Sequence, residues 1–184
     1  MGDPLFLSLW LKNFSALALP VYLKKAMQTF PHSKLDPRSV LRVYALSFHE
    51  APQLEEFYDQ AVDPQQVIDQ AQEFLHTDCA FQFETRWDLY QWDDDWNLKP
   101  ARVRIEIFGP EFDSPRGEQV RIDFDSEHYF LLNEHSDQLR PVQANIRSLL
   151  HLSQDMEEEL GGEKRILWSE DEEDFVERLK TMLD

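Results

Sequence analysis

The sequence FQFETRWDLY at residues 81–90 decides the fold, together with RVRIEI at residues 102–107. In both stretches apolar side chains alternate with polar ones, and VRIDFD at residues 120–125 repeats the pattern. Because successive side chains of a strand point to opposite faces of a sheet, this alternation indicates strands with one face on a core and one polar face. Three such strands joined by short linkers predict an antiparallel meander.

The rest of the chain supplies further strands and the helices that would cover the sheet. Apolar, β-branched and aromatic residues predict strands at residues 5–11, 39–48, 53–58 and 165–168. Helical spacing of apolar residues predicts amphipathic helices at residues 16–30, 64–76 and 139–160. We expect Gly161 to end the long helix, and a capping box at Ser169–Glu172 to begin a last one.

Length and composition fit one folded domain. The chain has 184 residues, of which 42% are hydrophobic and 12% aromatic, so it can bury a sizeable core. We therefore predict a single α+β domain over residues 1–184, with a mainly antiparallel sheet of about five to seven strands. Residues 1–62 could form an N-terminal subdomain.

The charge is strongly negative, with 18 Lys and Arg against 36 Asp and Glu, a net charge of −18. The negative excess lies after residue 48, because the first 48 residues carry more bases than acids. Such a field repels nucleic acid and anionic lipid, and it attracts a basic protein surface. The alternative is that the charge only keeps the protein in solution.

Cysteine content and hydropathy bear on the compartment. The single Cys79 cannot form an internal disulfide, which favours a reducing interior. The apolar stretch at residues 4–11 does not fit a signal peptide, because Asp3 precedes it and Lys12 closes it. No run approaches the roughly 18–20 apolar residues that span a bilayer. These features predict a cytoplasmic protein with no membrane contact.

An acidic loop flanked by tryptophans lies between the first two meander strands. It consists of Trp92, Asp93, Asp94, Asp95 and Trp96. Alternate acids there have the opening spacing of a calcium loop, but leucine stands where that loop needs glycine. The loop is a structural hairpin anchored by its tryptophans, a protein-binding tip that meets a basic groove, or a weak site for a cation or a sugar.

Arginines line the polar face predicted for the meander. Arg86, Arg102, Arg104 and Arg121 share that face with acidic residues of the neighbouring strands. Cross-strand ion pairs are one expectation. The other is a ligand site, because a planar guanidinium matches the geometry of a carboxylate or phosphate.

Catalytic, metal and cofactor motifs give weaker signals. Glu and His are neighbours at residues 49–50, 127–128 and 134–135, without the spacing of a metal-binding helix. Cys79 follows His76 by three residues at a helix C-terminus, where a thiol is not activated. Glycine-rich phosphate loops are missing. We assign no catalytic residue, no metal and no cofactor.

Charge and motifs together favour a non-enzymatic interaction module that docks on a basic protein, like an inhibitor or an immunity protein. The alternative is a domain or enzyme that binds a small molecule or anion through the arginines of the polar face. The first reading predicts a partner released by salt. The second predicts stabilisation by an anion or a metal.

Overall fold

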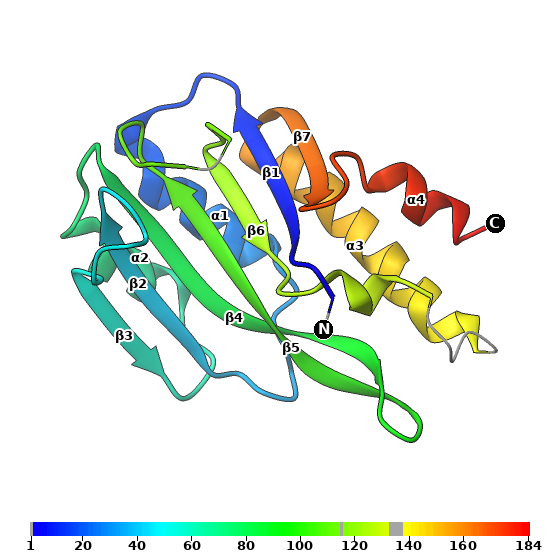
Figure 1. Ribbon diagram of the computed structural model, residues 1–184. Coiled ribbons are helices and arrows are strands. Elements are labelled where there is room, and N and C mark those ends of the chain that lie inside the picture. Colours follow the sequence, from blue (N-terminus) through cyan, green and yellow to red (C-terminus); the bar gives the residue numbers. More distant parts are fainter. Residues whose placement is uncertain (1, 115, 133–137) are drawn as a thin grey trace.

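A single seven-stranded sheet organises the protein (Figure 1). The computed structural model describes residues 2–114, 116–132 and 138–184. The strands lie in the order β3-β2-β4-β5-β6-β1-β7, and every neighbouring pair is antiparallel. Their bounds are β1 Leu5–Leu11, β2 Ser39–Ala45, β3 Leu54–Tyr58, β4 Cys79–Trp92, β5 Trp96–Phe108, β6 Val120–Asp123 and β7 Gly162–Ser169. The predicted α+β class and antiparallel sheet are confirmed.

The meander β4–β5–β6 is confirmed, but the first strand has an unforeseen place. β1 lies inside the sheet, where it pairs with β6 on one side and β7 on the other. The register of the second pairing sets Leu5 opposite Ser169, so the start of the chain lies beside the end of the last strand. The strands of residues 1–62 thus belong to the same sheet as the meander.

Three helices cover one face of the sheet (Figure 1). The helical segments are η1 Ala16–Ala18, α1 Leu19–Thr29, α2 Pro64–Gln72, η2 Glu127–Phe130, α3 Leu139–Leu160 and α4 Val176–Thr181. The alternating apolar residues of the meander face α1–α3 and form the core, in which Ile105 and Ile122 are fully buried. Among the described residues, no helix has the length and apolar character needed to cross a membrane.

The opposite side of the sheet, here called the outer face, carries the polar residues of the meander. At one end the loops after β2 and β5 fold over it, and the amide of Asp113 donates to the carbonyl of Leu46 at 3.0 Å. Phe48 and Phe112, which belong to these loops, pack against each other and against Phe108 at the end of β5. Leu46 has a φ of 68°, so β2 ends at Ala45 and not at residue 48 as predicted.

Several helix boundaries differ from the predictions. The helix predicted at residues 16–30 begins as a 3₁₀ turn, and the one predicted at residues 64–76 ends at Gln72. The predicted capping box is wrong, because Ser169 belongs to β7, its amide donates to the carbonyl of Glu172, and α4 begins only at Val176. Gly161, with a φ of 71°, ends α3 as predicted.

The β4–β5 hairpin extends well beyond its neighbours (Figure 1). β2 pairs with β4 only as far as Glu84, and β6 pairs with β5 only as far as Arg104. The outer part of the hairpin is therefore a two-stranded arm, defined here as residues 86–102. Asn145 of α3 fixes the arm to the helix through hydrogen bonds to both backbone groups of Tyr90.

Candidate functional site

The four arginines of the predicted ligand face lie on the outer face or its extension along the arm, and each forms an ion pair. Arg102 contacts Asp125 at 2.6 Å, and Arg104 contacts Asp123 at 3.2 Å. Arg86 contacts Asp36, from the loop before β2, at 3.1 Å. The fourth, Arg121, contacts Glu106 at 2.8 Å. The pairs of Arg104 and Arg121 join neighbouring strands, as expected for cross-strand pairs, whereas Arg86 and Arg102 pair with carboxylates outside the strands.

The pair of Arg121 and Glu106 is buried. Glu106 is only 2% exposed, and Gln82 donates to its second carboxylate oxygen at 3.0 Å. The guanidinium lies 5.1 Å from the ring centroid of Phe6 and 5.6 Å from that of Phe108. Burial raises the pKa of Glu106, and the adjacent Arg121 opposes this shift. This arginine holds a buried charge in place and offers little surface to a ligand.

A second buried carboxylate, Glu118, lies in the loop that precedes β6. It is 2% exposed, and neither of its oxygens makes a hydrogen bond of ordinary geometry within the described residues. Burial raises the pKa of this carboxyl group. Glu118 was not among the sequence candidates, because burial by a loop leaves no periodic signal.

Replacing Glu118 by glutamine is expected to flatten the pH dependence of stability above about pH 4.3, the ordinary glutamate value. The folded chain holds this proton to higher pH than the unfolded chain, so the free energy of unfolding falls as the pH rises through the folded-state pKa. Urea unfolding of both proteins at pH 5 and pH 8 measures the difference. An equal pH dependence in the two proteins would contradict a raised pKa of Glu118 in the folded chain.

The hairpin loop forms the tip of the arm. The rings of Trp92 and Trp96 lie 5.7 Å apart, with Trp92 37% exposed. Lys99 contacts Asp93 at 2.6 Å and lowers the pKa of that carboxyl, while residues 94–95 are exposed. The tip therefore combines a tryptophan pair with three exposed acidic residues. One of them, Asp93, already pairs with Lys99 of the same chain.

Carboxylates from three separate segments converge where β1 begins and β7 ends. This acidic cluster consists of Asp3, Glu127, Glu170 and Asp171. Asp171 raises the pKa of Asp3 by hydrogen bonding and repulsion. Burial raises the pKa of Glu127, and Asp3 adds to the shift. The sequence did not indicate that Asp3 and Glu127 lie together, because the pairing of the first strand with the last brings their segments together.

The weaker sequence candidates have ordinary surroundings. Cys79 is fully buried, and burial raises the pKa of its thiol, which disfavours the reactive thiolate. His128 shares a hydrogen bond with Ser126. The pair at residues 134–135 lies outside the described residues. Within residues 2–114, 116–132 and 138–184, no three His, Cys, Asp or Glu side chains are placed to hold a metal ion.

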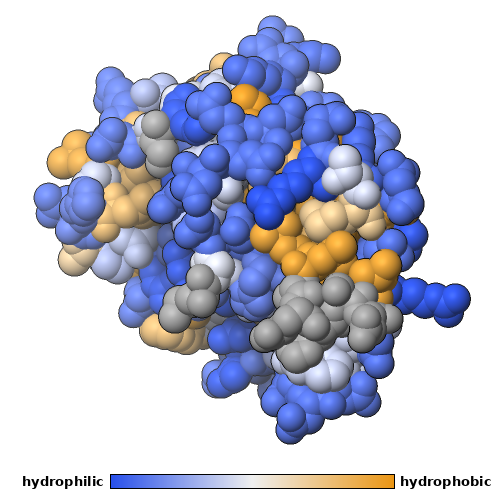
Figure 2. Space-filling model, turned by 45° about the vertical axis from the view of Figure 1, so that its right-hand side comes forward, coloured by the Kyte–Doolittle hydropathy of each residue, from blue (hydrophilic) through white to orange (hydrophobic). Residues whose placement is uncertain are grey.

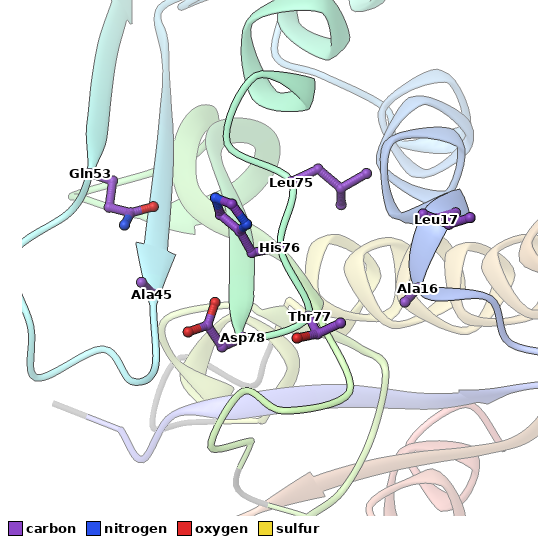
Figure 3. A pocket seen from close by; sticks show the side chains of 8 residues that line it. All are labelled: Ala16, Leu17, Ala45, Gln53, Leu75, His76, Thr77 and Asp78. Atoms are coloured by element: carbon purple, nitrogen blue, oxygen red, sulfur yellow. The ribbon is translucent and has the colours of Figure 1, made fainter.

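A broad hollow of about 650 Å³ lies between η1 and the loop before β4 (Figure 3). Gln53, His76 and Asp78 gather on one side of it, while Leu17 lies on the other (Figure 3). Leu17 is 83% exposed, so the hollow is open to solvent at that side. A small-molecule site buries most of its ligand, which an open hollow of this kind does not do.

The fold and surface define an α+β protein with one seven-stranded antiparallel sheet and a convergent acidic cluster. Comparison with protein-family models, with curated proteins and with solved structures finds no match.

Proposed function

We propose that this protein is a non-enzymatic interaction module whose acidic cluster docks on a basic protein, in the manner of an inhibitor or an immunity protein. The observation that carries the proposal is the convergence of Asp3, Glu127, Glu170 and Asp171 from three segments of the chain. Like charges held together raise the free energy of the folded state. A partner that supplies Lys or Arg would remove this repulsion on binding.

The overall charge supports the same partner. Even if every Lys and Arg neutralised one carboxylate, half of the 36 acidic side chains would remain uncompensated. The resulting negative field speeds the encounter with a basic surface and disfavours nucleic acid. The proposal includes a cytoplasmic location, because the lone Cys79 is a free, buried thiol.

The distribution of hydrophilic and hydrophobic residues on the surface suits a protein partner. The loop between β7 and α4 lies toward the right of Figure 1, the side that Figure 2 brings forward. Hydrophilic residues cover most of that view, and they border a hydrophobic patch (Figure 2). An apolar patch with a polar rim is typical of protein-binding surfaces. The arm tip, with Trp92 and Asp93–Asp95, provides a further acidic element for such contacts.

Anion binding by the outer-face arginines is the second candidate. Its support is Arg102, the most exposed of the four arginines, whose side chain is 47% exposed. An anion would have to displace Asp125, which contacts that guanidinium at 2.6 Å. This competition weakens the second candidate relative to the acidic cluster, whose neighbouring cation, Arg178, pairs with Glu172 at 3.1 Å.

Reversing two charges of the acidic cluster, with Glu170→Lys and Asp171→Lys, is expected to weaken partner binding at least roughly tenfold. Both residues are exposed, and their removal relieves repulsion, so stability should hold. The test is purification of the tagged protein from its native extract at low and high salt. Quantitative mass spectrometry identifies the basic protein that low salt retains and high salt releases.

A matched control carries Glu158→Lys and Glu159→Lys, two exposed acids near the end of α3. It makes the same change in net charge at a different place and should keep the partner. Loss of the partner from both variants would assign binding to net charge alone. Recovery of the bare wild-type protein at both salt concentrations would overturn the proposal and favour the arginine face, which a screen of anions would then test.

A further inference from the structure

A small cavity of about 210 Å³ lies beside α1, between the loop that leads into β2 and the loop that leads into α2. Its apolar wall consists of Met27, Pro37, Ala61, Val62, Pro64 and Phe83. Pockets that hold drug-sized ligands have volumes of roughly 300–1,000 Å³, so this one fits a smaller molecule. Such a wall selects a ligand that is mainly apolar.

His32 and Thr85 form a fixed hydrogen-bonded pair in the cavity wall. The Nε2 atom of His32 lies 2.7 Å from the carbonyl oxygen of Met27, which can only accept, so Nε2 carries the hydrogen. The Nδ1 atom of the neutral ring then accepts the hydroxyl hydrogen of Thr85 at 2.7 Å. Desolvation lowers the pKa of His32, which keeps the ring neutral. Thr85 therefore presents only acceptor lone pairs to the cavity.

Ser39, in contrast to Thr85, has a hydroxyl hydrogen that it can still donate. The residue lines the cavity and is 4% exposed, and its buried hydroxyl has no hydrogen-bond partner within the described residues. A buried hydroxyl without a hydrogen-bond partner destabilises the folded state, and a ligand that pairs with it removes this cost. The register of β2 against β4 ends at the pair Val40–Glu84, so Ser39 and Thr85 are the next residues along the two strands, and both line the cavity.

The charged and remaining polar groups of the wall are already satisfied. Asp36 pairs with Arg38 at 2.9 Å and with Arg86 at 3.1 Å, and the bond from Arg38 lowers the pKa of Asp36 to about 2. The hydroxyl of Ser33 donates to Asp88. The unused hydrogen-bonding capacity of the cavity is thus one hydroxyl, on Ser39, and one acceptor, on Thr85.

We infer that this cavity binds a small uncharged molecule that carries a hydroxyl group on an apolar ring or short chain. The ligand hydroxyl would donate to Oγ1 of Thr85 and accept from Oγ of Ser39, while its apolar part contacts Met27 and Phe83. A hydrocarbon would leave Ser39 unpaired, and an anion would face no cation inside the cavity wall. The inference does not depend on the proposed docking function.

Methyl NMR of the full chain labelled with ¹³C-methyl methionine tests it, with phenol, toluene and benzoate as probes. Met27 reports on the cavity, and the fully buried Met156 of α3, which does not line it, serves as the internal control. We expect phenol to shift the Met27 methyl signal saturably and to leave Met156 unchanged. Toluene should bind roughly tenfold more weakly, because it makes neither hydrogen bond, and benzoate should cause no shift.

Two variants separate the polar contact from the space. Ser39→Ala should reduce phenol affinity toward that of toluene without reaching it, because the bond to Thr85 remains, and should leave toluene unaffected. Ala61→Trp, at the exposed rim, should abolish both, while Ala51→Trp in an exposed loop outside the cavity should change neither. Equal affinity of wild-type protein for phenol and toluene, an unchanged phenol affinity in Ser39→Ala, or an unshifted Met27 signal would each overturn the inference.

Discussion

Replacing Arg121 with methionine is expected to lower the free energy of unfolding by about 3–5 kcal/mol, the cost of leaving a buried charge without its partner. Glu106 is 2% exposed and receives its ion pair from Arg121 at 2.8 Å, so the substitution leaves a carboxylate that water cannot reach. Gln82 remains as one donor and cannot neutralise the charge. Urea unfolding at pH 7 measures the loss.

Two further variants isolate the cause. Arg121→Met combined with Glu106→Met should recover most of the lost stability, because an apolar pair of similar volume removes both charges. Arg102→Met should cost no more than about 1 kcal/mol, since that guanidinium and its partner Asp125 are 47% and 36% exposed. If Arg121→Met lowers the free energy of unfolding no more than Arg102→Met does, the buried ion pair contributes no more to stability than the exposed one.

This contrast bears on the predicted ligand residues. Arg121 is held among aromatic rings and a buried carboxylate, whereas Arg102 is largely exposed. Sequence alternation places both on the same face of the sheet, and it cannot distinguish them. The difference arises from the loops after β2 and β5, which cover only one end of that face. Arg102 and Arg104 are therefore better placed than Arg121 to bind a ligand.

The meander and the long helix could be predicted because each follows from a local pattern. Alternation over residues 81–90 and helical spacing over residues 139–160 report which face of an element is buried. The place of β1 could not be predicted in this way. Its two apolar faces indicate an internal strand, but they carry no information on its partners, which lie more than a hundred residues away.

The same distinction applies to the candidate sites: some follow from a local sequence pattern, and others require the pairing of distant strands. The acids of the hairpin tip and of residues 170–173 are visible as runs in the sequence. The convergence of Asp171 with Asp3 and Glu127 requires the β1–β7 pairing. The cavity around Ser39 and Thr85 requires the register of β2 against β4. Single serines and threonines at strand positions have no pattern that distinguishes them from other strand residues.

Asn145→Ala is expected to destabilise the protein by about 2–4 kcal/mol and to release the arm from α3. Asn145 is 2% exposed, and its side chain accepts from the amide of Tyr90 and donates to the carbonyls of Tyr90 and Tyr129, each at 2.9 Å. Removing it leaves three backbone groups without their partner, each worth about 1 kcal/mol or more. Urea unfolding gives the stability, and amide hydrogen exchange at Tyr90 gives the local opening.

Gln143→Ala on the same helix is the matched control, because within the described residues its side chain makes one hydrogen bond, to the carbonyl of Met182 at 3.1 Å. It should cost about 1 kcal/mol and leave exchange at Tyr90 unchanged. Undiminished protection of the Tyr90 amide in Asn145→Ala would mean that another group replaces the Asn145 side chain as its hydrogen-bond partner. A polar residue in an apolar helical stripe usually weakens packing, but here it satisfies the strand edge that the neighbouring strands leave unpaired. Because the hydrogen bonds of Asn145 hold the arm against α3, we expect Asn145→Ala also to change the position of Trp92 and of the neighbouring acidic residues, while the net charge stays the same.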